Sequence, residues 1–202
     1  MPEVYDPKTL DFYSQTSETY LGSRPDGVSR HLHSFLSRLP PAVSILELGC
    51  GAGRDAEAMM AAGFHVDPTD GVSEIAHVAS KRLGRDVRVM RFDQLDATNT
   101  YDAVWANASL LHVPRDRLSA ILKLVFTALK PGGLHFASFK GGDAEGRDDR
   151  ARYYNYLARE EMIDFYEGSA DWEILSAIEY TGGGGYELKK GPWVAITARK
   201  PI

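Results

Sequence analysis

Three glycines, each separated by one residue, lie between an apolar run and a helical pattern. The segment reads Ile45-Leu46-Glu47-Leu48-Gly49-Cys50-Gly51-Ala52-Gly53-Arg54-Asp55. A strand, a glycine loop and a helix in this order direct backbone N–H groups and the positive end of a helix toward an anionic group of a ligand. Glycines allow the tight turn and leave no Cβ between backbone and ligand. The segment therefore predicts a nucleotide-type site at the carboxyl end of a parallel strand.

The spacing of the glycines narrows the choice of ligand. The dinucleotide fingerprint is G-x-G-x-x-G, whereas here the third glycine is Gly53 and Arg54 follows it. No Gly-Lys-Ser/Thr follows either, so the segment is not a phosphate loop of the nucleoside-triphosphate type. A nicotinamide-dependent oxidoreductase therefore remains only as an alternative.

Two further residues have types and positions that suit a site. Asp70 stands 21 positions after Gly49, close to the roughly 20 expected for an acid that binds ribose hydroxyls. Its alternative role is that of a helix cap. His112 is the titratable candidate after the fourth predicted strand, and either a catalytic or a structural role is open to it. Cys50 is interpreted as a small packing residue of the loop.

The elements that must position these residues follow from the hydrophobic pattern. Strands are predicted at 43–48, 64–66, 87–90, 101–105 and 134–139, with the second ended by Pro68. Helices are predicted at 7–21, 28–39, 54–62, 72–83, 115–129 and 159–167. Two more strands, at 172–180 and 192–199, flank Gly182-Gly183-Gly184-Gly185, which is expected to be a flexible link. The pattern predicts an α/β, Rossmann-like doubly wound sheet of seven strands, mostly parallel, with an antiparallel edge hairpin.

At this point the sequence resembles the class I (seven-stranded) S-adenosylmethionine-dependent methyltransferases. The run 47–53 is similar to their first motif, Phe92-Asp93-Gln94-Leu95 stands where that family holds adenine, and Lys130-Pro131-Gly132-Gly133 is similar to the usual turn into the fifth strand. The resemblance implies S-adenosylmethionine as cofactor. It implies cofactor contacts from Glu47, Gly49, Cys50, Gly51, Gly53, Asp70, Gly71, Asp93, Gln94, Leu95, Ala106 and Asn107, with His112 as the catalytic candidate.

A narrower resemblance concerns the second half of the chain. The runs 105–115 (Trp-Ala-Asn-Ala-Ser-Leu-Leu-His-Val-Pro-Arg) and 138–140 are similar to a bacterial branch related to tellurite-resistance methyltransferases. The charged loop 143–152 follows, and it is either a solvated segment or a lid over the acceptor. In the second case Arg147, Arg152 and Tyr153 are the predicted substrate-binding residues, because guanidinium groups bind oxyanions and carboxylates. The N-terminal tyrosines are assigned to the core or to a cap over the cofactor.

Length and composition bound the function. The 202 residues are expected to form one methyltransferase domain, with a helical cap at 1–42, a cofactor-binding core at 43–140, a lid-like loop at 141–158, and a C-terminal helix with the edge hairpin at 159–202. The net charge of −5 and the lack of a basic stripe argue against a nucleic-acid partner. One cysteine, no signal-like start and no long apolar run predict a cytoplasmic protein without a membrane partner.

The expected function is methyl transfer from S-adenosylmethionine to a small-molecule acceptor by in-line displacement. No metal site is expected, and the protein is expected to be a monomer or a homodimer. A cofactor-binding protein without catalysis is the second alternative, beside the oxidoreductase. The sequence leaves open whether the acceptor is an oxyanion, a thiol or an amine.

Overall fold

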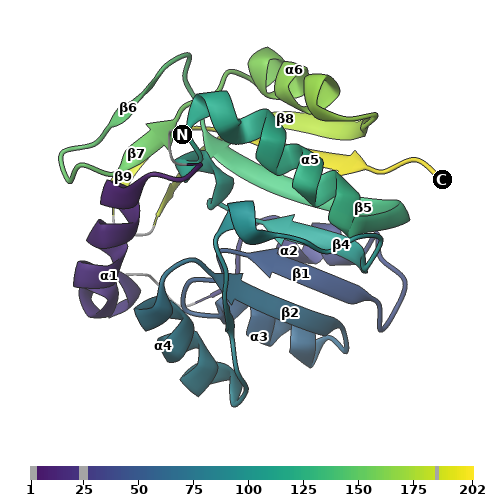
Figure 1. Cartoon of the computed structure of the whole chain (residues 1–202), viewed down its shortest axis with the longest axis horizontal. Helices are drawn as coiled ribbons and strands as arrows, with labels where there is room; N and C mark the ends of the chain where they lie inside the picture. Colours follow the sequence, from purple (N-terminus) through teal and green to yellow (C-terminus); the bar gives the residue numbers. More distant parts are fainter. Residues whose placement is uncertain (1–3, 23–26, 185–186) are drawn as a thin grey trace.

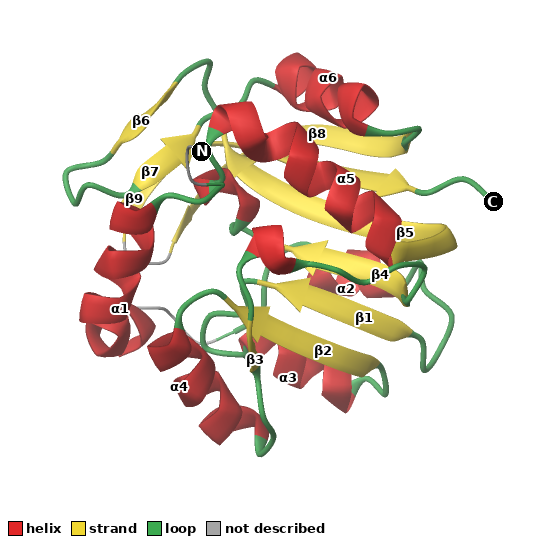
Figure 2. Ribbon diagram, in the orientation of Figure 1, coloured by secondary structure: helices red, strands yellow, loops and turns green. Residues whose placement is uncertain are grey.

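The parallel part of the sheet is built from alternating strands and helices, as their apolar patterns require. The computed structural model describes residues 4–22, 27–184 and 187–202. In chain order, β1 (Ser44–Leu48), α3 (Arg54–Ala61), β2 (His65–Asp70), α4 (Ser73–Leu83), β3 (Arg88–Val89), β4 (Tyr101–Ala106), α5 (Leu118–Ala128) and β5 (Leu129–Lys140) make the alternating region. Figure 2 shows the strands side by side with helices on both faces.

The seven strands have the order β3-β2-β1-β4-β5-β9-β8. The first five are parallel, and β9 (Glu187–Arg199) inserts antiparallel between β5 and β8 (Glu173–Gly184). The predicted fold class is therefore confirmed, including the antiparallel edge. The order turns back at β1 and β4, which places a crevice at the carboxyl ends of these two strands.

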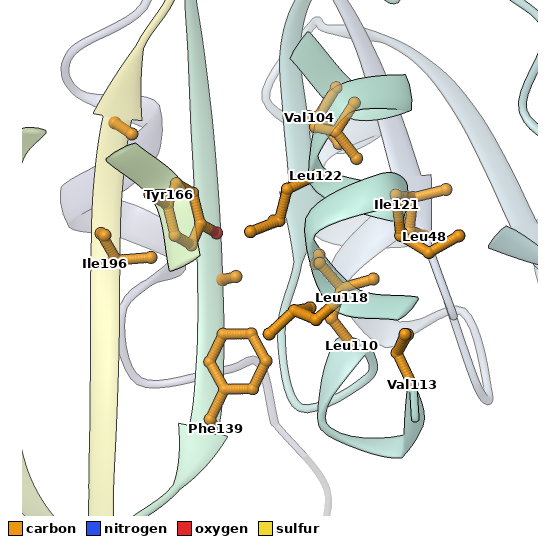
Figure 3. Close-up of a cluster of buried hydrophobic side chains, with 14 of the residues drawn as sticks. Leu48, Val104, Leu110, Val113, Leu118, Ile121, Leu122, Phe139, Tyr166 and Ile196 are labelled. Atoms are coloured by element: carbon orange, nitrogen blue, oxygen red, sulfur yellow. The ribbon is translucent and has the colours of Figure 1, made fainter. Parts of the chain in front are cut away.

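Each central strand sends alternate side chains into two cores. Leu46, Leu48 and Val104 pack with α5 and with α6 (Arg159–Ser169) on one face. Ile45 and Trp105 pack on the other face with α3 and α2 (Leu32–Leu36). Figure 3 shows the α5 stripe of the first core, in which Leu118, Ile121 and Leu122 point at the sheet. Burial on both faces explains why the strands are apolar runs rather than alternating ones.

The remaining elements lie around the carboxyl edge of the sheet. Figure 1 shows α1 (Pro7–Gly22) beside α4 and near a two-stranded hairpin of β6 (Glu145–Arg147) and β7 (Tyr153–Asn155). Three short 3₁₀ helices, η1 (Phe92–Gln94), η2 (Leu110–His112) and η3 (Arg115–Arg117), complete the described elements. The charged loop 143–152 thus contains a strand, which the sequence pattern did not predict.

Several predicted boundaries are wrong, and two of them have a clear physical reason. Pro68 does not end the second strand. The position where Pro68 lacks an N–H faces β3, and β2 pairs with β3 only from Thr69 onward, so the proline removes no hydrogen bond of the sheet. The helix predicted at 28–39 is α-helical only over Leu32–Leu36 and then continues as turns. Gly182 to Gly184 continue β8 instead of forming a link. A Cβ at Gly182 would lie 2.6 Å from Trp193 Cδ1, so the lack of a side chain at Gly182 lets the Trp193 indole pack on the strand. Gly185 lies outside the described residues.

Candidate functional site

A cavity lies at the carboxyl ends of β1, β2 and β4. The sheet side of its lining includes Gly49, Gly51, Asp70, Gly71 and Asp93. The opposite side comes from α1 and the residues before it. The cavity forms where the predicted glycine loop and acids meet.

The glycine loop has a conformation that only glycine adopts without strain. Gly49, Gly51 and Gly53 have φ angles of 76°, 54° and 75°. The Thr69 carbonyl accepts hydrogen bonds from Gly49 N and Cys50 N at 2.9 and 2.8 Å. A Cβ at Gly49 would lie 2.6 Å from Ser109 Cβ, so this loop and the segment after β4 are in direct contact.

Asp70 is bonded to both the glycine loop and the residue before α4, and the ribose-binding role stays a prediction for it. Its Oδ2 accepts a hydrogen bond from Gly51 N at 3.1 Å, and its Oδ1 accepts one from Val72 N at 3.0 Å at the start of α4. The side chain also lines the cavity. Asp70 therefore holds the glycine loop against α4 while it presents a carboxylate to the site.

The segment after β3 places Asp93 in the cavity wall. Arg91 binds Asp93 with two hydrogen bonds, of 3.0 and 3.1 Å. Phe92 lines the cavity beside Asp93. Gln94 is exposed and accepts a hydrogen bond from Arg91 N, whereas Leu95 is buried in the core. The predicted adenine segment therefore lines the site only through its first two residues.

A second cavity adjoins the first, and Gly49 and Ala108 line both. Asn107 lies in it and is held by two side chains: its Nδ2 donates to Ser29 Oγ at 2.7 Å, and its Oδ1 accepts from Ser138 Oγ at 2.9 Å. Ser29 was not predicted from the sequence. Its contact with Asn107 spans 78 positions, so no local pattern reveals it.

Glu47 is the buried acid of this second cavity. Its side chain is only 3% exposed, and its Oε2 has no hydrogen-bond partner among the described residues. Burial, and then the neighbouring carboxylates of Asp55 and Asp70, raise the pKa of Glu47 well above its usual value. An unpartnered buried carboxyl oxygen costs free energy, and a ligand that brings an ammonium group would relieve that cost.

His112 lines the first cavity and joins three segments. Its Nδ1 lies 2.7 Å from the Tyr153 backbone oxygen, which accepts only, so Nδ1 carries the proton. Its Nε2 then accepts from the Tyr13 hydroxyl at 2.9 Å. Burial lowers the pKa of His112 to about 4, and the charges of Arg152 and Lys140 act in the same direction. The imidazole is therefore neutral at pH 7.

The predicted substrate-binding residues have protein partners. Arg147 forms an ion pair with Asp6 and does not line either cavity. Arg152 is 3% exposed and forms an ion pair with Asp148 at 2.6 Å. The Tyr153 hydroxyl donates to Glu145 and accepts from Arg115 N. These three residues tie the β6–β7 hairpin to its surroundings, and a role in binding an acceptor stays a prediction for them.

The other predicted residues divide by position. Cys50 lines the second cavity as a buried free thiol, and burial raises its pKa. Gly53 and Ala106 line neither cavity. Gly53 packs against Leu83, and a Cβ at Gly53 would lie 3.3 Å from Leu83 Cδ1. Ala106 is fully buried in β4. Among the residues that the structure describes, no group of three His, Cys, Asp or Glu side chains is arranged to hold a metal ion.

Parts of this chain match known proteins in sequence. Residues 45–133 match the family described as a methyltransferase domain. The ubiquinone biosynthesis O-methyltransferase of Xanthomonas axonopodis pv. citri is 33% identical over 129 residues, which are 56% of this chain and 53% of that protein. The cypemycin N-terminal methyltransferase of a Streptomyces species is 31% identical over 156 residues, 71% of this chain and 62% of that one.

A solved structure extends the similarity to most of the chain. The crystal structure of an S-adenosylmethionine-dependent methyltransferase from Methanosarcina mazei matches with a TM-score of 0.75 and 18% identity, over 88% of this chain and all (100%) of that chain. The fold of this chain is thus similar to that of a solved S-adenosylmethionine-dependent methyltransferase, and residues 45–133 match a methyltransferase domain. The matched part of the chain covers 53% of the length of the Xanthomonas protein and 62% of the length of the Streptomyces protein.

Proposed function

We propose that this protein transfers the methyl group of S-adenosylmethionine to a small-molecule acceptor by in-line displacement. The observation that carries the proposal is the pair of adjoining cavities that meet at Gly49 and Ala108. One presents the acids suited to a nucleoside, and the other presents a buried acid suited to an ammonium group. An elongated ligand with both groups fits this arrangement.

The residues fit the two ends of S-adenosylmethionine. Asp70 and Asp93 would bind the adenosine half, since carboxylates accept hydrogen bonds from ribose hydroxyls and from an adenine amine. Glu47 would bind the ammonium group of the methionine half, which gives its unpartnered Oε2 a donor. The sulfonium of the bound cofactor supplies an electrophilic methyl group.

The chain's own contribution to the reaction is alignment and exclusion of water. Orientation of donor and acceptor supplies much of the rate in a displacement of this kind. Tyr13 and Thr9 of α1 close the cavity from the side opposite the glycine loop. His112 is proposed to lie near the acceptor as a neutral hydrogen-bonding group, which suits an acceptor that needs little help from a base.

The acceptor is proposed to be small for two reasons. α1 covers the first cavity on the side opposite the glycine loop, which suits a small acceptor, and the net charge of −5 gives no attraction to a polyanion. The relatives from Xanthomonas and Streptomyces are named for ubiquinone biosynthesis and for cypemycin. We also propose that the protein belongs to the tellurite-resistance branch, that it is cytoplasmic, and that it is a monomer or a homodimer. No described helix is both long and apolar enough to cross a membrane.

Two measurements test the proposal. Calorimetry with S-adenosylmethionine, S-adenosylhomocysteine and a nicotinamide dinucleotide is expected to show binding of the first two only. Binding of the dinucleotide alone would contradict the cofactor assignment. A transfer assay over tellurite, selenite, thiols and small amines, measured by release of S-adenosylhomocysteine, is expected to find a substrate. Cofactor binding with no product from any acceptor in the panel would favour a non-catalytic binding protein.

A further inference from the structure

The N-terminal half of α1 is less deeply buried than its carboxyl end. Tyr20 and Leu21 at the carboxyl end are buried, whereas Leu10 and Tyr13 pack against the same cluster and are only partly buried. Near the amino end, Asp6 pairs with Arg147, and Thr9 Oγ1 accepts from Tyr153 N at 2.8 Å. Hydrogen bonds of this kind contribute little net free energy each, so this half separates from the body more easily than the packed end.

Two segments from outside the sheet, α1 and β7, are bonded to one imidazole. His112 donates from Nδ1 to the backbone of β7, at Tyr153, and accepts at Nε2 from Tyr13 of α1. These partners lie 41 and 99 positions from His112 in the sequence. His112 itself belongs to η2, directly after the strand that ends at the cavity. One side chain of the body therefore connects α1 and the hairpin.

The buried Arg152 side chain also bonds to the Tyr13 hydroxyl that contacts His112. Arg152 Nη1 donates to the Tyr13 hydroxyl at 3.2 Å, and the Arg152 guanidinium lies 5.3 Å from the centre of the Tyr154 ring. Asp148 fixes the guanidinium through Nε at 2.8 Å. The Tyr13 oxygen thus accepts from Arg152 while its hydrogen is donated to His112, which makes the position of this hydroxyl well defined.

We infer that the first half of α1 forms a lid over the cavity, with His112 as its anchor, Tyr13 as the positioning residue that keeps it closed over bound ligand, and the β6–β7 hairpin as the support to which both are bonded. The inference rests on the proposed function for the identity of that ligand. Because Tyr13, Thr9 and Asp6 line the cavity, a bound cofactor lies beneath them, and its release requires that these residues move. The neutral state of His112 keeps Nε2 able to accept the Tyr13 hydrogen at neutral pH.

The release rate of S-adenosylhomocysteine tests this directly. Tyr13→Phe keeps the ring and removes the hydroxyl, and the dissociation rate of S-adenosylhomocysteine, measured by stopped-flow displacement, is expected to rise about tenfold, the scale of one hydrogen bond. KM for S-adenosylmethionine is expected to rise by a similar factor. The matched control is Tyr101→Phe, which loses a hydroxyl bonded to Asp67 at the amino end of β4. Equal release rates in both variants would overturn the inference.

A double-mutant cycle asks whether Tyr13 acts through His112. His112→Asn retains a donor for the Tyr153 carbonyl and removes the acceptor for Tyr13. If the two side chains act through one contact, the double variant releases ligand no faster than about the faster single variant. Multiplied effects would show that Tyr13 acts independently of His112 and would contradict the anchor.

A ligand-free measurement separates failure of the lid from failure of the proposed function. Hydrogen exchange is expected to speed up over residues 7–13 and 145–155 in Tyr13→Phe and to stay at the wild-type rate there in Tyr101→Phe. Absence of S-adenosylhomocysteine binding to the wild type would contradict the proposed function and leave this expectation in place. Unchanged exchange in Tyr13→Phe would overturn the lid whether or not the ligand binds.

Discussion

Asp70 and Glu47 are acids of the same site whose surroundings differ. Both oxygens of Asp70 accept backbone N–H groups, from Gly51 and Val72, and the side chain faces the first cavity. Glu47 has one oxygen without a partner among the described residues. The first carboxylate is therefore prepared for hydroxyl donors of a ligand, and the second is completed only by a ligand that donates to it.

Asp70→Ala is expected to weaken the binding of S-adenosylmethionine by about 1–3 kcal/mol, the scale for lost hydrogen bonds to a charged group. Calorimetry measures this difference. Because the variant also loses the contact to Gly51, a ligand change provides the control. Wild-type protein is expected to bind the 2′-deoxy analogue of S-adenosylhomocysteine more weakly than the parent, and Asp70→Ala is expected to bind both equally. A variant that still discriminates between them would exclude Asp70 as the ribose contact.

Glu47 gives the free protein a pH dependence of known sign. Its pKa is raised in the folded state, so the folded chain binds more protons than the unfolded chain above pH 4.5. Stability therefore falls as pH rises through the window between the two pKa values. Glu47→Gln removes this loss, and its free energy of unfolding relative to wild type is expected to be higher at pH 8 than at pH 5. Urea denaturation at both pH values measures this, and an equal difference at both would contradict the assignment.

At the scale of elements, the strand–glycine loop–helix unit was predictable and the β6–β7 hairpin was not. The β1–α3 unit depends on a local pattern of apolar residues and glycines, which the sequence displays directly. The β6–β7 hairpin lies within a charged stretch, where charge gives no periodic signal of pairing. Pro68 likewise fits a strand only because of which neighbour its missing N–H faces, and a one-dimensional pattern does not contain that information.

Gly49→Ala is expected to destabilise the fold by at least about 2 kcal/mol and to abolish cofactor binding. The left-handed backbone costs a side chain about 1–2 kcal/mol, and the contact with Ser109 adds an overpacking cost. Gly63→Ala is the matched control, because Gly63 has a φ of 88° with no atom within 4 Å of a Cβ. The stability that Gly63→Ala loses measures the backbone cost alone. Equal loss in the two variants, measured by thermal and urea unfolding, would refute the role of the Gly49–Ser109 contact.

At the scale of the whole molecule, two histidines with lowered pKa values contribute to the response to acid. Burial lowers the pKa of His112 and of His135 to about 4. His135 is fully buried in β5, with its Nδ1 3.1 Å from the Val104 carbonyl. Below pH 6.5 the unfolded chain binds protons at these residues that the folded chain does not. Stability contributed by both histidines is therefore lost as pH falls from 6.5 toward 4.

His135→Gln is expected to flatten this acid dependence. Between pH 6.5 and 4 the slope of the free energy of unfolding is expected to fall by up to about 1.4 kcal/mol per pH unit, the value for one proton. Urea titrations at half-unit intervals measure the slope. His77→Gln, at an exposed helical position, serves as the control and is expected to leave it unchanged. An unaltered slope in His135→Gln would show that another group carries the acid response.

The sequence by itself determined the alternating strands and helices, the antiparallel edge, the glycine loop and the position of Asp70, since each depends on neighbours in the chain or on a fixed spacing. Only the tertiary structure decided that α1 covers the cavity, that Asn107 meets Ser29, and that Tyr13 and Tyr153 meet at His112. These contacts join segments that are far apart in the sequence. They arise from how the finished sheet positions separate chain ends at one edge, and packing in three dimensions leaves no periodic trace in the order of residues.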